Sequence, residues 1–152
     1  MNNEAILLSI QPKYAKKILA GEKKVELRRI RPRIQEGDLV IIYASSPVMA
    51  VIGSFIVDHV ITKHPRDLWH IVKESACISQ EEFETYYEGC KVGIGIFISK
   101  VRPAGIPLKL EEIREIWPDF HPPQGYRYLA PIGGRVNIFL PILKKICSFY
   151  GD

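Results

Sequence analysis

The sequence has few cysteines, and their spacing does not suit a metal site. Cys77, Cys90 and Cys147 are an odd number at wide intervals, with no C-x-x-C pair and no histidines at the distances typical of zinc ligands. The four histidines are scattered as well. We therefore expect reduced thiols and no bound metal.

Long hydrophobic runs are also missing. The longest ones, such as residues 39–44 and 48–52, are far shorter than the roughly 18 residues that a membrane span needs. The N-terminus has no basic stretch before its apolar residues and no small-residue cleavage site after them, so no secretory signal is indicated. The sequence predicts a cytoplasmic protein that does not contact a membrane.

Two common nucleotide-binding motifs are absent. There is no P-loop sequence, and the pair Gly93 and Gly95 lacks the third glycine and the following helix of a dinucleotide fingerprint. We expect no cofactor.

Length and composition predict a single globular domain over residues 1–152. The mass is 17.3 kDa, 47% of the residues are hydrophobic and 25% are charged, which is close to the average for soluble domains. A chain of this length can bury a substantial core.

The charge is unevenly distributed. Residues 1–35 hold nine basic and three acidic residues, a net of +6, whereas the whole chain carries +4, so the remainder sums to −2. Residues 74–88 contain five glutamates and no Lys or Arg. A polyanionic partner should therefore meet the first quarter of the chain.

Hydrophobic periodicity and turn residues predict short strands with helices inserted between them. We expect strands over 5–10, 24–30, 39–44, 48–61 and 91–101, and helices over 12–20, 65–74, 79–89, 110–117 and 140–150. Gly53 is typical of a bulge or bend where a sheet curls. The order favours an α+β protein built on a small, mostly antiparallel barrel over a doubly wound parallel sheet.

Three charged residues lie close together where the first helix joins the next strand. Side chains 26 and 28 of a strand share one face about 7 Å apart, and Lys23 in the preceding turn can fold over that face. Glu26 could accept from an exocyclic amine, Arg28 could bind a carbonyl or phosphate, and Lys23 could neutralise charge. Alternatively, the group is an exposed ion pair worth about 0.2–1 kcal/mol.

The segment LLSIQPKYAKKILAGEKKVELRRIRP resembles the start of an ASCH domain, whose hallmark G-x-K-x-x-E-x-R is matched by Gly21, Lys23, Glu26 and Arg28. The later part, with a two-helix insert at about 64–89 and the sequence PPQGYRYL, is similar to archaeal and bacterial members described as transcriptional regulators. The resemblance implies a PUA-like pseudo-β-barrel with a cleft beside the first helix.

Relatives of this kind are thought to bind RNA or other nucleic acids, and related barrels accept a base swung out of its stack. Tyr14 could stack on such a base or belong to the core. The residues that we expect to line the cleft are Lys13, Tyr14, Lys23, Glu26, Arg28, Arg29 and Ser45.

The resemblance leaves catalysis open. Some bacterial ASCH proteins remove the acetyl group from acetylated cytidine with a threonine three residues after the lysine, but that position is Glu26 here, a poor nucleophile toward an amide. Attack by water with Glu26 as general base and Lys23 polarising the carbonyl is an alternative. Other relatives are ribonucleases, in which such a group would activate the 2′-hydroxyl. Lys23 and Glu26 are the candidate catalytic residues in either case.

Two further segments carry alternatives. The acidic two-helix insert is poorly suited to DNA, so we interpret it as a cover or a protein-contact element, with Phe83, Tyr86 and Tyr87 facing inward. Arg127 and Tyr128 either stack against bases or pack on the barrel.

We expect binding of RNA, another nucleic acid or a modified nucleoside, with a regulatory role in transcription or translation. A small hydrolase and a protein-interaction regulator are the alternatives.

Overall fold

The computed structural model describes residues 5–129. The predicted helix over 140–150 lies outside this range. The elements within it, in chain order, are β1 (Ala5–Ile10), α1 (Pro12–Leu19), β2 (Val25–Arg28), β3 (Leu39–Ala44), β4 (Ala50–Lys63), α2 (Pro65–Val72), α3 (Gln80–Tyr86), β5 (Gly93–Lys109), α4 (Leu110–Ile116) and β6 (Tyr126–Leu129).

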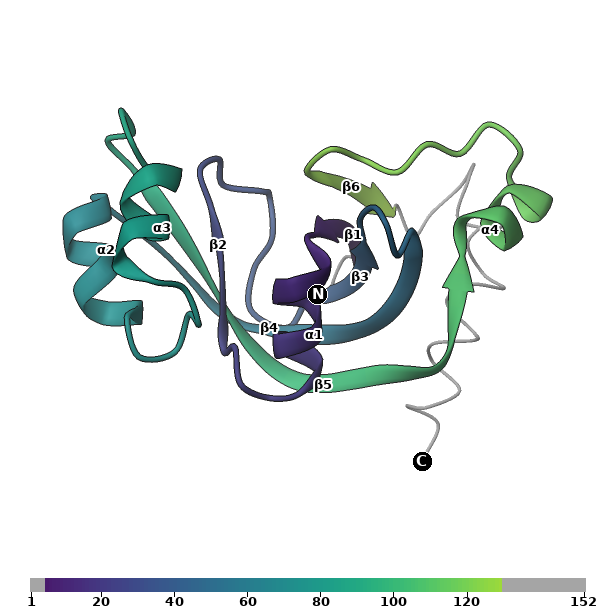
Figure 1. Cartoon of the computed structure of the whole chain (residues 1–152), viewed down its shortest axis with the longest axis horizontal. Coiled ribbons are helices and arrows are strands. Elements are labelled where there is room, and N and C mark those ends of the chain that lie inside the picture. Colours follow the sequence, from purple (N-terminus) through teal and green to yellow (C-terminus); the bar gives the residue numbers. More distant parts are fainter. Residues whose placement is uncertain (1–4, 130–152) are drawn as a thin grey trace.

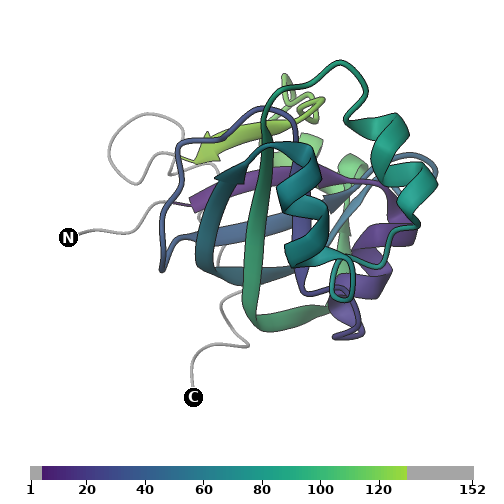
Figure 2. The same cartoon turned by 90° about the vertical axis from the view of Figure 1, so that its left-hand side faces the viewer.

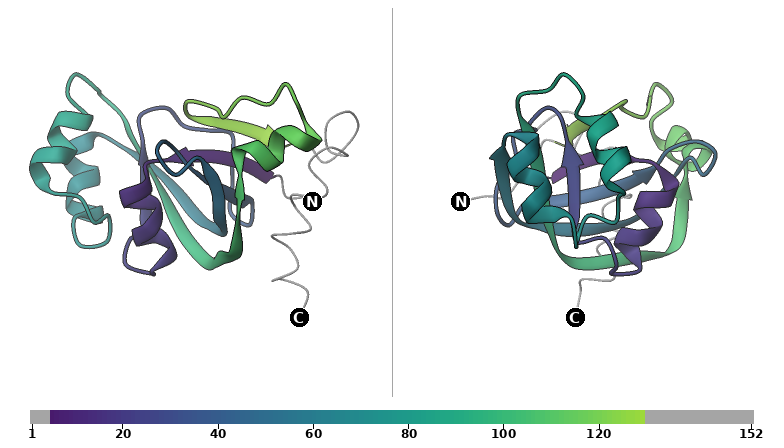
Figure 3. Two further views of the ribbon diagram at one scale, coloured as in Figure 1. Left: turned by 45° about the vertical axis from the view of Figure 1, so that its right-hand side comes forward. Right: turned by 60° about the vertical axis from the view of Figure 1, so that its left-hand side comes forward.

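The six described strands form one curled sheet in the order β2-β5-β4-β3-β1-β6. β1 and β3 are parallel, and the other neighbouring pairs are antiparallel. The long strands β4 and β5 bend together through the middle of the sheet, with α2 and α3 at one end and α4 at the other (Figures 1 and 3). The expected α+β, mostly antiparallel PUA-like pseudo-barrel is therefore confirmed.

Gly53 marks the place where β4 curls. The register of β4 shifts there against both β3 and β5. A Cβ atom at this position would lie 2.6 Å from the Cδ2 atom of Leu19 and 2.7 Å from the carbonyl oxygen of Arg102. Only glycine lets α1 and β5 approach this closely, so the predicted bend has a packing cause.

The segment from β1 to β2 follows the sequence pattern closely. Pro12 begins α1, Ala15 and Ile18 are its buried residues, and Gly21 follows the helix at φ +79°. The strand expected over 24–30 is shorter in the structure, where β2 spans Val25–Arg28, and Val25, Glu26 and Leu27 are all buried. Val25 and Leu27 lie on the face that α2 and α3 cover, whereas Glu26 is buried on the opposite face beside Arg28.

The insert α2–α3 packs over β2 and the adjacent end of β5 (Figure 2). Phe83 and Tyr87 are buried in a small core with Val25, Leu27 and Leu68. The inward stripe is thus confirmed at these two aromatic residues, while Tyr86 is half-buried and turns toward the cleft described below.

Residues 126–129, for which no strand was expected, form β6. This short strand pairs antiparallel with β1 at the outer edge of the sheet. Over residues 5–129, no helix is long and apolar enough to cross a bilayer.

Candidate functional site

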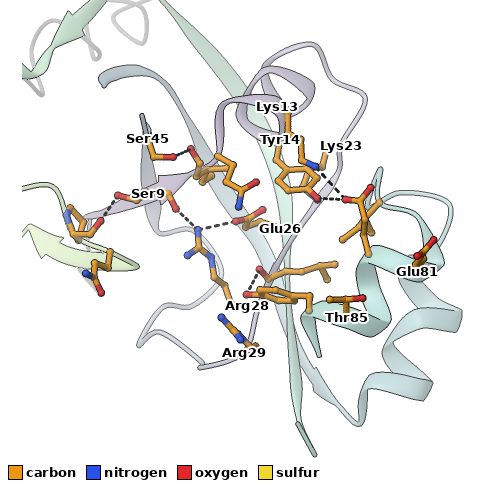
Figure 4. Close-up of a pocket in the computed structure, with 18 residues that line it drawn as sticks. Ser9, Lys13, Tyr14, Lys23, Glu26, Arg28, Arg29, Ser45, Glu81 and Thr85 are labelled. Atoms are coloured by element: carbon orange, nitrogen blue, oxygen red, sulfur yellow. Dashed lines mark hydrogen bonds and ion pairs between the residues drawn. The ribbon is translucent and has the colours of Figure 1, made fainter. Parts of the chain in front are cut away.

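A cleft of about 820 Å³ lies between α1, β2 and α3 (Figure 4). Its lining brings together the whole predicted set: Lys13, Tyr14, Lys23, Glu26, Arg28, Arg29 and Ser45. Lys13 and Ser45 are 32 residues apart in the sequence. They line the same cleft because they follow β1 and β3, whose ends lie side by side in parallel.

Glu26 and Arg28 form a largely buried ion pair. Nη2 of Arg28 lies 2.9 Å from Oε2 of Glu26, and the two side chains are 15% and 8% exposed, respectively. The same Nη2 atom donates to the carbonyl oxygen of Ser9 at 2.8 Å. Nε of Arg28 is buried and has no hydrogen-bond partner within residues 5–129. The cleft therefore contains a guanidinium with donor capacity left over.

Lys23 is the second buried cation of the cleft, with 3% of its surface exposed. Nζ donates to the carbonyl oxygen of Ala76 at 2.5 Å and lies 5.0 Å from the ring centroid of Tyr14. Burial lowers the pKa of Lys23, and the nearby negative charge of Glu26 partly opposes that shift. A neutral amine is therefore available at lower pH than for an exposed lysine.

Helices α1 and α3 meet at the rim of the cleft through Glu82. The hydroxyl of Tyr14 donates to Oε2 of Glu82 at 2.6 Å, and Nζ of Lys13 lies 3.4 Å from the same oxygen. The hydrogen bond from Tyr14 is the main reason that the pKa of the Glu82 carboxyl is lowered. The insert thus forms one wall of the cleft, in agreement with its interpretation as a cover.

Both tyrosine rings of the cleft already contact cations. Nζ of Lys13 lies 4.8 Å from the ring centroid of Tyr14, which also faces Lys23. Cζ of Arg29 lies 4.7 Å from the ring centroid of Tyr86. A base that stacks on either ring would have to share it with a cation or displace the cation. The stacking role of Tyr14 stays a prediction.

The structure does not bring Arg127 and Tyr128 into the cleft lining. The guanidinium carbon of Arg127 lies 4.5 Å from the ring centroid of Trp117, and the hydroxyl of Tyr128 accepts from the backbone N–H of Arg33. Both residues are on β6, across the sheet from β2. They belong to a neighbouring surface rather than to the predicted cleft.

Sequence reasoning did not assign several lining residues. Those from the insert are Ile78, Glu81, Glu82, Thr85 and Tyr86, and those before β6 include Pro123 and Gln124. The helix expected over 79–89 does begin here, where the hydroxyl of Ser79 accepts from the backbone N–H of Glu82. The sequence pattern carried no signal that the same glutamate reaches α1.

No cluster of three His, Cys, Asp or Glu side chains suited to a metal ion occurs among the described residues. The chemistry that the cleft offers is that of an amine, a carboxylate and a guanidinium. These groups can bind an anion and move a proton.

The chain matches a known protein family over most of its length. The model of the ASCH domain matches residues 8–117, which is well over half of the chain. The chain belongs to the ASCH domain family. It is 30% identical over 123 residues to an ASCH domain-containing ribonuclease of Zymomonas mobilis, an alignment that covers 81% of this chain and 82% of that protein.

Solved structures agree with this assignment. The crystal structure of ASCH from Zymomonas mobilis superposes with a TM-score of 0.83 at 26% identity and covers 97% of this chain and 96% of that one. The N-terminal domain of McrB from Thermococcus gammatolerans, bound to m5C DNA, has a TM-score of 0.53 at 12% identity, over 95% and 99% of the two chains. At that identity, the second likeness concerns the fold alone.

Proposed function

We propose that this ASCH domain binds single-stranded RNA and cleaves it in the cleft formed by Lys23, Glu26 and Arg28. The observation that carries the proposal is the largely buried position of all three head groups in one cleft, where Nε of Arg28 is buried with no hydrogen-bond partner in the described part of the chain. Buried charges are costly to fold unless they are paired, so an arrangement of this kind is typical of functional sites. A relative that is 30% identical and is named a ribonuclease supports the same reaction class.

The two walls of the cleft suit different parts of a nucleotide. Arg28 and Arg29 on the β2 side can bind phosphate oxygens. The α3 side presents Glu81 and Glu82, and residues 79–89 contain no Lys or Arg. Phosphates should therefore lie toward β2, and the exocyclic amines of a base can donate to the carboxylates of α3.

The proposed step is attack by the 2′-oxygen of a ribose on the adjacent phosphorus. The neutral amine of Lys23 accepts the 2′-hydroxyl proton, the bond between phosphorus and the 5′-oxygen breaks, and the leaving oxygen takes up a proton from water. The products are a 2′,3′-cyclic phosphate and a 5′-hydroxyl. Arg28 stabilises the charge on the phosphorane, and Glu26 holds the Arg28 guanidinium in place.

Two alternative functions would use the same cleft. A nucleoside hydrolase would act on acetylated cytidine, with Glu26 as the base for water. A regulator of transcription or translation would hold RNA without cleaving it. The acidic insert as a protein-contact element also stays a prediction, although one side of it is committed to the cleft.

The test is cleavage of a fluorescent single-stranded RNA, with the DNA of the same sequence and acetylated cytidine as parallel substrates. Wild type should cut RNA to cyclic phosphate products and leave DNA intact. Lys23→Met should lose at least about 100-fold in rate, the lower end of what a general base contributes. Lys24→Met is the matched control, because Lys24 is exposed and does not line the cleft.

The pH profile identifies the base. Because the charge of Glu26 raises the pKa of Lys23, Glu26→Gln should move the ascending limb of the rate profile to lower pH. Turnover of acetylated cytidine with no RNA cleavage would refute the ribonuclease proposal and support the nucleoside hydrolase. RNA binding without cleavage would refute it and support the regulator.

A further inference from the structure

The segment that leaves β2 carries three exposed arginines in alternate positions and no acidic residue. Arg29, Arg31 and Arg33 are all exposed, and Arg29 also lines the cleft. We call these three residues the arginine track. We propose that the arginine track binds the phosphates of the RNA strand on one side of the nucleotide held in the cleft. This inference rests on the proposed function and adds the path of the strand.

Each guanidinium of the track is held by a different element of the fold. Arg29 stacks on Tyr86 of the insert at 4.7 Å, and Arg33 stacks on Tyr128 of β6 at 4.7 Å. Nη1 of Arg31 donates to the hydroxyl of Thr62 in β4 at 2.9 Å. These contacts restrict long side chains that would otherwise be free, so less entropy is lost when a phosphate binds.

The backbone of the track is fixed at its far end as well. The N–H of Arg33 donates to the hydroxyl of Tyr128, and Pro32 just before it is buried. Tyr128 therefore serves as a positioning residue for Arg33. Tyr128 thus contributes to the proposed phosphate binding next to the cleft, although it does not line the cleft.

The charges on the two walls of the cleft determine the direction in which an RNA strand can leave it. Phosphates that passed over α3 would meet Glu81 and Glu82. Phosphates that follow residues 29–33, where the chain runs from β2 toward β6 in Figure 1, meet Arg29, Arg31 and Arg33. Residues 29–33 can span at most roughly 14 Å, which is enough for a few phosphates but not for a long duplex contact. The track therefore suits the flank of a single strand.

The experiment compares a fluorescein-labelled uridine dinucleotide with a labelled 12-nucleotide oligouridylate, both with 2′-O-methyl groups in place of the 2′-hydroxyls to prevent cleavage, by fluorescence anisotropy at several salt concentrations. For the 12-mer, Arg31→Ala/Arg33→Ala should lower the logarithmic salt slope by about 1.4, because each single-strand phosphate contact contributes about 0.7. The dinucleotide occupies the cleft alone, so its affinity should stay within about twofold. Arg31→Lys/Arg33→Lys should keep most of the slope.

The matched control is Arg66→Ala/Lys73→Ala, which removes two exposed charges from α2 and its C-terminal end. It should leave the slope unchanged, and circular dichroism establishes that each variant is folded. If the salt slope for the 12-mer is unaltered in Arg31→Ala/Arg33→Ala, the arginine track is refuted while the proposal for the cleft stands. The same conclusion follows if the variant loses as much affinity for the dinucleotide as for the 12-mer. If wild type binds neither oligonucleotide, both proposals fail.

Discussion

Replacing Glu26 by glutamine separates the charge of the buried pair from its shape. The carboxylate lies 2.9 Å from the Arg28 guanidinium, and neither side chain is more than 15% exposed. At an effective dielectric constant of about 20, this separation corresponds to an attraction of roughly 4–6 kcal/mol, which is offset in part by the cost of burying both ions. Removing one partner of a buried pair typically costs about 3–5 kcal/mol, because the other charge is left uncompensated.

We expect Glu26→Gln to fall at the lower end of that range, near 3 kcal/mol, because the amide oxygen can still accept from Arg28. For a chain of this size, the melting temperature should drop by about 6–12 °C. Urea unfolding at pH 7 measures the loss. Glu22→Gln, at an exposed position, is the control and should change the free energy of unfolding by no more than about 0.5 kcal/mol.

A second substitution tests the cause of the loss. In Glu26→Gln/Arg28→Met the uncompensated guanidinium is gone, so this variant should recover at least about 1 kcal/mol relative to Glu26→Gln alone. If Glu26→Gln is as stable as wild type, the carboxylate is not the desolvated partner of Arg28. The reasoning about a buried charged cleft would then be refuted.

Three other outcomes are expected. Because burial lowers the pKa of Lys23 in the folded protein, the unfolded chain binds more protons than the folded protein as the pH rises toward 10.5. The stability of wild type relative to Lys23→Met should therefore rise as the pH increases toward 10.5; parallel urea curves would contradict this. Gly53→Ala should cost about 1–3 kcal/mol by overpacking, whereas Gly125→Ala, which has open space, should be nearly neutral in thermal melts. Tyr87→Phe removes a 2.9 Å hydrogen bond to the Arg28 carbonyl and should cost about 1 kcal/mol in urea unfolding; no loss would mean that this bond does not support β2.

The part of the site that sequence reasoning predicted well comes from one local segment. Lys23, Glu26 and Arg28 lie within six residues, and the end of α1 comes shortly before them. Pro12 at the start of the helix, Gly21 after its end and strand alternation indicate their relative positions, although contacts with Ala76 and Ser9 also hold Lys23 and Arg28 in the fold. The cleft residues at 13 and 14 follow from the same helix.

The other wall of the cleft could not be predicted because its contacts are distant in sequence. Tyr14 and Glu82 are 68 residues apart, and Lys13 and Glu82 are 69 apart. Neither pair has a local periodicity that would indicate contact. The burial of Glu26 was not indicated either, because alternation within β2 places it on the face opposite Val25 and Leu27, beside Arg28.

Strand lengths also depended on pairing. The expected strand ended at residue 101, but β5 continues to Lys109 because it remains paired with β4 past its bend. Pro103 and Pro107 in this stretch favoured an end of the strand. β6 was missed for a related reason: its four residues follow two prolines, and its pairing with β1 is what orders them as a strand.

Chemical-shift mapping tests the location of the site most directly. A nitrogen-15-labelled protein would be titrated with a short single-stranded oligouridylate whose reactive 2′-hydroxyls are replaced by 2′-O-methyl groups to prevent cleavage. The amides of residues 23–29 and 82–86 should shift together, with saturation at one common affinity that Lys23→Met and Glu26→Gln weaken. Shifts confined to α4 or to the far face of the sheet, with residues 23–29 unmoved, would contradict a cleft built on Lys23, Glu26 and Arg28.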